Sequence, residues 1–173
     1  MTAKTLFITG ASSGIGAATA RAARLAGWNV GLFARSEDKL LALVEELGDR
    51  SLALVGDVTS LDDQNKALAK LRQTYGGVDA AFANAGMGVD AAGTENGDPE
   101  EWDRLVDVNI KGLLYTAKAA MPHLRLRKGH MVMTGSAAGR VHISGSVYGA
   151  SKWFVHGFGG NLAEEMKQWG GRC

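Results

Sequence analysis

Short apolar runs of strand character alternate with longer helical patterns along this chain, and glycines stand at many of the changes. Strands separated by helices pair in parallel, and right-handed crossovers then place helices on both faces of the sheet. The sequence therefore predicts an α/β fold, a Rossmann-like doubly wound parallel sheet in three layers (α/β/α) with strand order 3-2-1-4-5. The expected strands span residues 5–9, 29–34, 51–58, 79–83 and 130–136. The expected helices span 17–25, 37–47, 60 to about 76, 98 onward, about 108–127 and 147 to about 169.

Capping residues indicate where several of these helices begin. Ser36 precedes two acidic residues, which favour a helix N-terminus. Ser60 and Asp63 have the spacing of a capping box. Asp98, followed by a proline and two acids, is a third N-cap after a glycine-rich loop. Pro122 should bend or divide the stretch 108–127, because proline lacks the N–H that a helix interior needs.

Length and charge restrict the partners of the chain. A chain of 173 residues is enough for one domain, so we expect residues 1–173 to form a single domain. The net charge of +1 gives no reason to expect nucleic acid or a membrane, and favours a small-molecule partner. Cys173 is the only cysteine, which argues against disulfides and a metal site. With no signal peptide or membrane-length apolar run, we expect a cytoplasmic protein.

A glycine-rich turn joins the first expected strand to the first helix. Gly10, Gly14 and Gly16 follow the spacing G-x-x-x-G-x-G, which differs from the G-x-G-x-x-G of many dinucleotide sites. Glycines let a backbone approach a pyrophosphate, and the helix that follows offers free N–H groups and the positive end of its dipole. The turn therefore predicts a dinucleotide site where the winding of the sheet reverses, between strands one and four.

Five elements in this order resemble the short-chain dehydrogenase/reductase family: Thr9–Gly16, Asn84–Gly86, Asn109, Ser136 and Tyr148–Lys152. The resemblance covers nearly the whole chain, and implies a nicotinamide cofactor and the interconversion of carbonyl and alcohol substrates. It also implies that Asn109, Ser136, Tyr148 and Lys152 are catalytic. It further implies that Asn84–Gly86 stabilise the central sheet beside the cofactor and that Asp57 and Val58 contact its adenine. With the glycine turn and Arg35 included, the expected cofactor-binding residues are Gly10, Ser12, Ser13, Gly14, Ile15, Gly16, Arg35, Asp57, Val58, Asn84, Ala85, Gly86, Tyr148 and Lys152.

The chemistry explains these residue types. Negative charge develops on oxygen when a carbonyl accepts hydride, so a proton donor and a hydrogen-bond donor should converge on that oxygen. Tyr148 would give the proton and Ser136 would hold the oxygen. Lys152 follows Tyr148 by one helical turn, and an ammonium about 4 Å away at an effective dielectric of 20 stabilises a phenolate by on the order of 4 kcal/mol. A role for Asn109 in relaying protons from Lys152 through water rests on the resemblance alone.

The end of the second strand bears on which cofactor is bound. NAD-binding sites usually place an acid there, whereas an arginine accommodates the 2′-phosphate of NADP. Arg35 stands at this position, so we expect NADP(H) to be favoured over NAD(H). The alternative is that Arg35 is only an exposed charge where a helix begins.

Members of the family are usually longer, with two more strands and a segment that covers the substrate. We therefore expect the last strands to be missing and the edge of strand five to be unpaired. Two function classes remain open: an active oxidoreductase, or a truncated, inactive dinucleotide-binding module. A sugar-nucleotide epimerase is a third, less favoured reading. The resemblance also implies a homodimer or homotetramer through the helices after strands four and five. The loops 87–97 and 137–147, which should contact the substrate, do not specify it.

Overall fold

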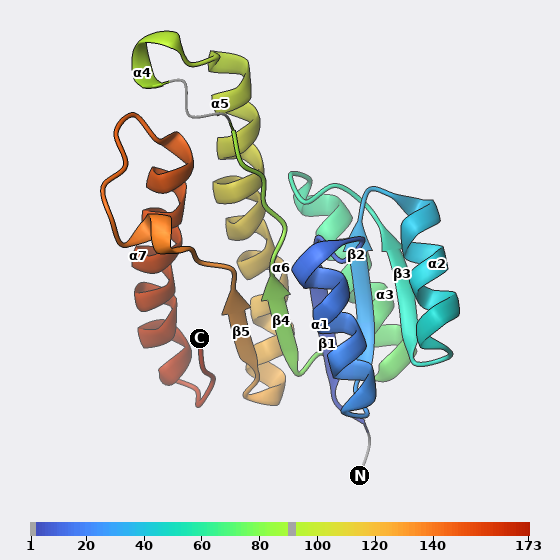
Figure 1. Ribbon diagram of the computed structural model, residues 1–173. Helices are drawn as coiled ribbons and strands as arrows, with labels where there is room; N and C mark the ends of the chain where they lie inside the picture. Colours follow the sequence, from blue (N-terminus) through green and yellow to red (C-terminus); the bar gives the residue numbers. More distant parts are fainter. Residues whose placement is uncertain (1–2, 90–92) are drawn as a thin grey trace.

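The computed structural model describes residues 3–89 and 93–173 and contains the expected parallel sheet (Figure 1). Its five strands lie in the order β3-β2-β1-β4-β5, which confirms the predicted topology. All four strand pairings are parallel. The strands are β1 (Thr5–Thr9), β2 (Asn29–Ala34), β3 (Ser51–Val55), β4 (Ala80–Ala83) and β5 (His130–Met133).

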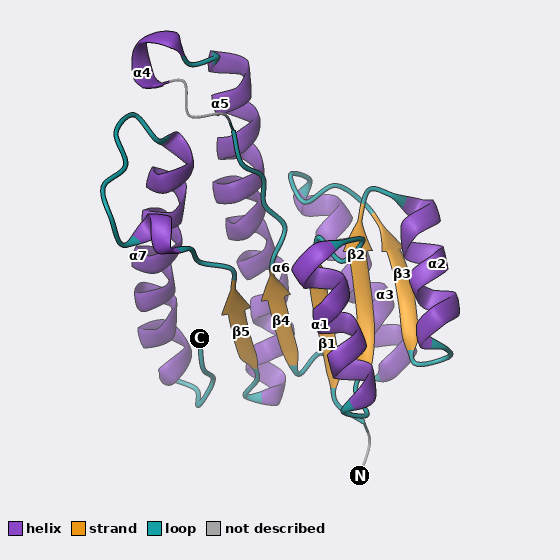
Figure 2. Cartoon of the chain, viewed as in Figure 1, coloured by secondary structure: helices purple, strands orange, loops and turns teal. Residues whose placement is uncertain are grey.

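Helices cover both faces of the sheet, so the molecule has the three layers expected (Figure 2). Helices α1 and α2 lie on one face, and α3, α6 and α7 pack on the other side. Helix α5 and the short α4 extend beyond the carboxyl ends of the strands. The helices are α1 (Gly14–Leu25), α2 (Glu37–Leu47), α3 (Leu61–Tyr75), α4 (Gly93–Asn96), α5 (Pro99–Val106), the π-helix η1 (Asp107–Gly112), α6 (Leu113–Arg127), the 3-10 helix η2 (Ala137–Gly139) and α7 (Val147–Lys167).

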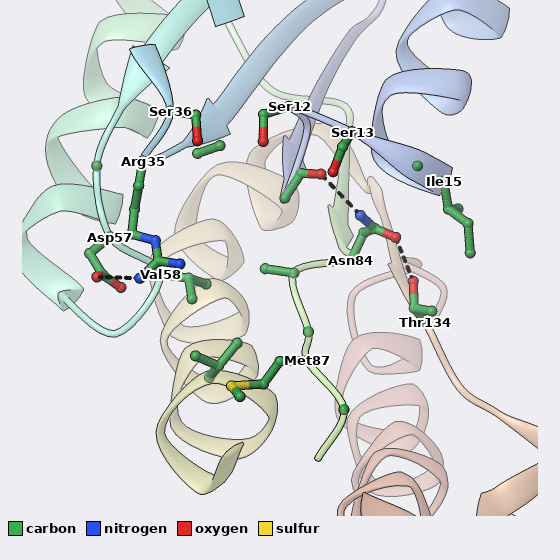
Figure 3. Close-up of a pocket in the computed structure, with 18 of the residues that line it drawn as sticks. Ser12, Ser13, Ile15, Arg35, Ser36, Asp57, Val58, Asn84, Met87 and Thr134 are labelled. Carbon is green, nitrogen blue, oxygen red and sulfur yellow. Dashed lines mark hydrogen bonds and ion pairs between the residues drawn. The ribbon is translucent and has the colours of Figure 1, made fainter. Parts of the chain in front are cut away.

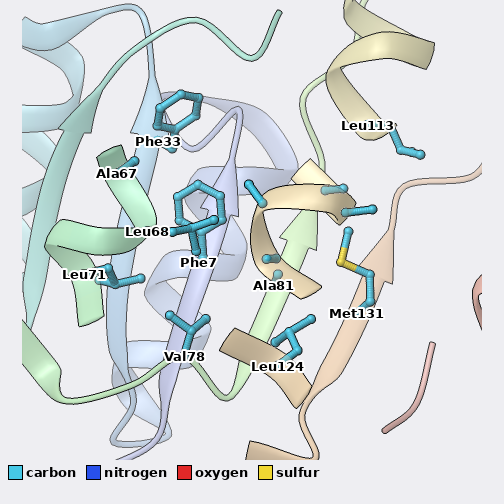
Figure 4. Close-up of a cluster of buried hydrophobic side chains, with 14 of the residues drawn as sticks. Phe7, Phe33, Ala67, Leu68, Leu71, Val78, Ala81, Leu113, Leu124 and Met131 are labelled. Carbon is cyan, nitrogen blue, oxygen red and sulfur yellow. The ribbon is translucent and has the colours of Figure 1, made fainter. Parts of the chain in front are cut away.

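Two hydrophobic clusters, one on each face, hold the layers together. In β1, Phe7 joins the cluster beneath α3 and α6, whereas Leu6 and Ile8 join the cluster beneath α1 and α2. Figure 4 shows Phe7 and Phe33 among the aliphatic side chains of the first cluster. Because alternate residues of a strand point to opposite faces, a strand covered on both faces is apolar on both, as Leu6, Phe7 and Ile8 of β1 are.

Helix ends follow the local signals to different degrees. The Ser60 hydroxyl accepts the Asp63 N–H at 3.2 Å, and the Asp98 carboxylate accepts the Glu100 N–H at 2.9 Å. Two of the three predicted N-caps are thus confirmed by their side-chain bonds. Ser36 stands at the N-cap position of α2, but its side chain makes no capping bond. Helix α1 begins at Gly14, three residues earlier than expected.

Two strands are shorter than the sequence predicts. The run 51–58 forms a strand only to Val55, because Gly56 packs against the Phe33 ring and Asp57 turns back so that its N–H donates to Asp63. Strand β5 ends at Met133, so Ser136 does not end a strand but caps η2. The residues after both strand ends, 56–58 and 134–136, are partly buried but lie outside the sheet.

Pro122 does not divide its helix. Helix α6 continues through it to Arg127, and η1 joins α6 to α5 without a break. The irregularity falls instead in η1, residues 107–112, where the backbone is a π-helix. Such π-turns are rare and often accompany functional sites.

The edge of β5 is paired at one point. The Met131 N–H donates to the Arg172 carbonyl at 2.8 Å, and the Arg172 N–H donates to Gly129 at 3.2 Å. Val132 beside this contact is 52% exposed. The expectation of an unpaired edge is therefore wrong at this bridge. In the two stretches that the structure describes, no helix is both long and apolar enough to cross a bilayer. The cytoplasmic location stays a prediction.

Candidate active site

A cavity of about 510 Å³ opens at the carboxyl ends of β1, β2 and β4, where the winding of the sheet reverses (Figure 3). It brings together most of the residues that the sequence assigned to the cofactor. Gly16, which was assigned to the cofactor, is not part of its wall, and neither are Asn109 and Ser136, which were assigned to catalysis. The wall consists of Gly10, Ser12, Ser13, Gly14, Ile15, Ala34, Arg35, Ser36, Gly56, Asp57, Val58, Asn84, Ala85, Gly86, Met87, Gly88, Val108, Thr134, Tyr148 and Lys152.

The glycine turn has the geometry of a phosphate cradle. Gly10 and Gly14 have positive φ angles of 65° and 52°. A Cβ on Gly10 would lie 2.9 Å from the Cα of Ala85, and one on Gly16 would overlap the carbonyl oxygen of Gly10. Ser13 makes no side-chain cap bond, so the first N–H groups of α1 remain available to an anion. The turn therefore fits the pyrophosphate of a dinucleotide.

Asn84 connects the ends of three strands. Its Nδ2 donates to the carbonyls of Thr9 at 3.1 Å and Gly10 at 3.4 Å, and its Oδ1 accepts the Thr134 hydroxyl at 3.0 Å. The Thr9 hydroxyl in turn accepts the N–H groups of Asn84 and Ala85, each at 3.1 Å. The side chain of Asn84 thus fixes the glycine turn relative to β4 and to the residue after β5, as Figure 3 shows.

Tyr148 and Lys152 lie on one face of α7 and both reach the cavity. The Lys152 ammonium lies 5.6 Å from the centre of the Tyr148 ring, within the range of a cation–π contact. It also donates to the Thr134 carbonyl at 2.9 Å. Lys152 is 6% exposed, and this burial lowers its pKa below the ordinary lysine value. The structure thus places a half-buried phenol and a buried ammonium together in the cavity wall.

Asn109 lies in the π-helix η1, behind the wall rather than in it. Its Oδ1 accepts the Met87 N–H at 2.8 Å, and its Nδ2 donates to the Met87 carbonyl at 2.9 Å. The same nitrogen donates to the Ser151 hydroxyl at 3.2 Å. Asn109 therefore fixes the loop after β4 against α7, next to Lys152.

Ser136 lies at the start of η2, and its hydroxyl accepts the Ala138 N–H at 3.1 Å. The His156 ring is 3.3 Å from the Ser136 carbonyl, and so connects this segment to α7. Ser136 and Tyr148 are thus carried by segments that pack together, but Ser136 does not line the cavity.

Arg35 lies at the other end of the cavity, near Ser12, Ser36 and Asp57 (Figure 3). Its guanidinium is 4.0 Å from the Asp57 carboxylate, and its side chain is 78% exposed. A pair this exposed contributes little to stability. Arg35 is therefore free to reach an anion bound in the cavity.

Sequence reasoning missed Thr134, which binds both Asn84 and Lys152. Its only signal was its place near the carboxyl end of the fifth expected strand, at the edge where ligands bind. Met87 was expected only as part of a substrate loop, yet its main chain holds Asn109. Residues 90–92 of that loop lie outside the described residues.

Comparison with known proteins identifies the family. The sequence model of the family described as short chain dehydrogenase matches residues 4–173. The chain belongs to the short-chain dehydrogenase family. It is 37% identical over 173 residues to an uncharacterized oxidoreductase of Staphylococcus aureus, an alignment that covers 98% of this chain and 74% of the relative. A similarly named oxidoreductase of Staphylococcus saprophyticus is 35% identical over 175 residues, with the same coverage.

Solved structures of short-chain dehydrogenases have the same fold. A 3-ketoacyl-(acyl-carrier-protein) reductase from Brucella melitensis, complexed with NADH, superposes with a TM-score of 0.93 at 29% identity, covering 99% of this chain and 73% of the other. A serine dehydrogenase from Escherichia coli superposes with a TM-score of 0.88 at 32% identity, covering 93% and 76%. This chain is therefore an oxidoreductase by family, with a fold that holds a nicotinamide cofactor in a close structural neighbour.

Replacing Gly16 tests the packing of the glycine turn. In Gly16→Ala the added methyl would overlap the Gly10 carbonyl and lie 2.8 Å from Asn84 Nδ2. We expect the free energy of unfolding to fall by about 1–3 kcal/mol, measured by urea denaturation. Gly157→Ala on α7 is the control, because nothing lies within 4 Å of its added methyl. Equal stability of the two variants would show that the turn tolerates a side chain.

Proposed function

We propose that the protein is an NADP(H)-dependent oxidoreductase that interconverts a carbonyl compound and a secondary alcohol, with Tyr148 as the general acid and base. The observation that supports this most is the approach of Lys152 to the Tyr148 ring, 5.6 Å from its centre, in the wall of the cavity that the glycine turn opens. A dinucleotide whose pyrophosphate lies on the turn would extend along this wall. Residues 1–173 then act as one dinucleotide-binding domain.

The residues divide the chemistry between them. A bound nicotinamide supplies or accepts the hydride. In the reducing direction Tyr148 gives its hydroxyl proton to the substrate oxygen, and in the oxidising direction it takes that proton back. Lys152 stabilises the phenolate through its positive charge. Ser136 would donate a hydrogen bond to the substrate oxygen, which requires its hydroxyl to turn toward Tyr148 while it still accepts the Ala138 N–H.

Asn109 has a supporting role in this proposal. Its amide holds both main-chain groups of Met87 and the Ser151 hydroxyl, and Ser151 precedes Lys152. Asn109 therefore keeps the main chain of Met87, in the cavity wall, at a fixed separation from α7. A water-linked proton relay from Lys152 through Asn109 stays a prediction from the family resemblance.

The loss of the phenol hydroxyl tests the mechanism. Purified chain should oxidise NADPH in the presence of mixed aldehydes and ketones, followed by the absorbance of the reduced cofactor. In Tyr148→Phe we expect turnover to fall by about 10²–10⁴-fold, with cofactor affinity retained, because only the proton donor is lost. Tyr75→Phe is the matched control, since Tyr75 is the last residue of α3 and its hydroxyl donates to the Asp49 carbonyl, outside the cavity wall. Equal turnover in wild type and Tyr148→Phe would reject the tyrosine mechanism.

The same assay separates the alternative function. The chain covers 74% of the length of the Staphylococcus aureus relative, and an inactive dinucleotide-binding module would bind cofactor without turning over any substrate. Binding of NADPH by the wild type with no turnover across the panel would favour the module.

We further propose that Arg35 selects NADP(H). Its exposed guanidinium lies at the end of β2, with the hydroxyls of Ser12 and Ser36 in the same wall. A 2′-phosphate bound there would accept a charge-assisted hydrogen bond from Arg35. This bond would replace the weak contact of Arg35 with Asp57, at 4.0 Å.

Arg35→Ala tests the cofactor preference. We expect the affinity for NADPH to fall by about 10–100-fold, the effect of one hydrogen bond to a charged group, while the affinity for NADH changes little. Both dissociation constants are measured by titration calorimetry. Arg104→Ala is the control, because this arginine pairs with Glu100 on α5, away from the cavity wall. If wild type binds NADH as tightly as NADPH, the assignment of Arg35 is wrong.

A homodimer through α6 and α7 is the third part of the proposal. A groove of about 830 Å³ runs between these helices and is lined by apolar side chains that include Met121, Leu126 and Phe158. Leu126 is 71% exposed. Lys118 and Glu165 also border the groove, so a two-fold arrangement would bring opposite charges together.

An acidic residue in the groove should separate the dimer. We expect wild type to sediment as a dimer at micromolar concentration and Leu126→Asp to sediment as a monomer, because a carboxylate would be buried in an apolar interface. Leu25→Asp is the control, since Leu25 is 91% exposed on α1, outside the groove. A monomeric wild type, or dissociation by both substitutions, would contradict this interface.

A further inference from the structure

Gln64 is a buried glutamine whose amide contacts two segments of the site. It lies in the second turn of α3 and is 0% exposed. Its Nε2 donates to the Val58 carbonyl at 2.7 Å and to the Gly112 carbonyl at 3.2 Å, which uses both of its hydrogens. Val58 belongs to the cavity wall near Arg35, and Gly112 ends the π-helix. One amide thus joins the Arg35 end of the cavity to the helix that carries Asn109.

The orientation of this amide is fixed by the two carbonyls. A rotated amide would direct Oε1 at two carbonyl oxygens, which is unfavourable. In the orientation observed, Gln64 Oε1 is buried and has no partner among the described residues. A buried acceptor without a partner costs stability, so stability alone would favour an apolar side chain at this position. An apolar side chain would lack the two hydrogen bonds that Gln64 donates to the Val58 and Gly112 carbonyls.

Each of the two segments also has an anchor of its own. The Asp63 carboxylate accepts the Asp57 N–H at 3.0 Å, on the Val58 side. The Thr116 hydroxyl donates to the Gly112 carbonyl at 2.8 Å, on the other side. Of the three side chains Asp63, Thr116 and Gln64, only Gln64 bonds to both segments. The segments also touch, because a Cβ on Gly112 would lie 3.0 Å from Val58 Cγ1.

We propose that Gln64 is a positioning residue that couples the adenine-binding end of the cavity to the placement of Asn109. The Gly112 carbonyl lies where the π-helix passes into α6, so a donor there stabilises the turn that directs Asn109 at Met87. Through Val58, the same amide holds the segment expected to contact adenine. The adenine half of this inference rests on the proposed dinucleotide function, and the Asn109 half does not.

The test removes both bonds while it keeps the volume. Gln64→Met has a similar side chain without donors, and methionine fills irregular core space. We expect the affinity for ADP, measured by calorimetry, to fall about fivefold, and amide hydrogen exchange at Met87 to quicken about fivefold, each from the loss of one hydrogen bond. The exchange at Met87 should quicken more than that of Ile8 in the core, which reports global stability.

Two control variants separate the effect on ADP affinity from the effect on amide exchange at Met87. Asp63→Ala should weaken ADP binding and leave the exchange at Met87 unchanged, whereas Thr116→Val should do the reverse. Gln64→Leu is measured in parallel, in case Gln64→Met does not fold. The proposal is overturned if the Gln64 variants change neither quantity, change only one, or quicken Met87 no more than Ile8. If wild type does not bind ADP, the dinucleotide function fails. The exchange at Met87 still decides whether Gln64 positions Asn109.

Discussion

The hydrogen bonds of the Asn84 side chain are the contact on which the rest of the site depends. They join the carbonyls of Thr9 and Gly10, at the end of β1, to the Thr134 hydroxyl beyond β5. Parallel strands leave unpaired polar groups where they end, and such groups need partners when they are partly buried. Asn84 has both a donor and an acceptor on one short side chain, so it satisfies polar groups at the ends of β1 and β5, the strands on either side of β4. An aspartate there would lack the donor for the two carbonyls.

Thr134 carries this restraint to α7, the helix of Tyr148 and Lys152. Its hydroxyl is held by Asn84, and its carbonyl accepts the Lys152 ammonium at 2.9 Å. The ammonium needs such a partner because it is buried, and burial lowers the pKa of Lys152. The folded protein therefore binds this proton less well than the unfolded chain does. Lys152 consequently disfavours folding at low pH, and this cost disappears as the pH rises toward the ordinary lysine value. A charge held at the expense of stability suggests a role in function rather than in folding.

The sequence predicted best what depends on neighbouring residues. The bounds of β1, β2 and α2 were right because apolar runs and glycines define them. The strands that end at Val55 and Met133 were predicted three residues too long, because the residues that follow stay partly buried without pairing in the sheet. Pro122 was expected to bend or divide a helix, and the helix is not divided there. The π-helix has no sequence signal, and neither does the bond from Gln64 to the Gly112 carbonyl, which lies 48 residues away in the chain. Thr134 escaped notice because its site partners come from distant segments.

Contacts between backbones, rather than side chains, bring the loop before α7 against α4. Gly145 precedes α7 with a φ angle of 61°, and a Cβ on it would lie 2.8 Å from the Cα of Gly93 at the start of α4. Gly93 also has a positive φ angle, of 78°. A larger residue at Gly145 would therefore separate the two segments, whereas a Cβ on Gly93 would meet nothing within 4 Å and only its φ angle favours glycine there. For this reason the small residues there, which specify no substrate by themselves, still determine how closely the loop before α7 approaches α4. The separation of these two main chains is a property that residue types alone do not reveal.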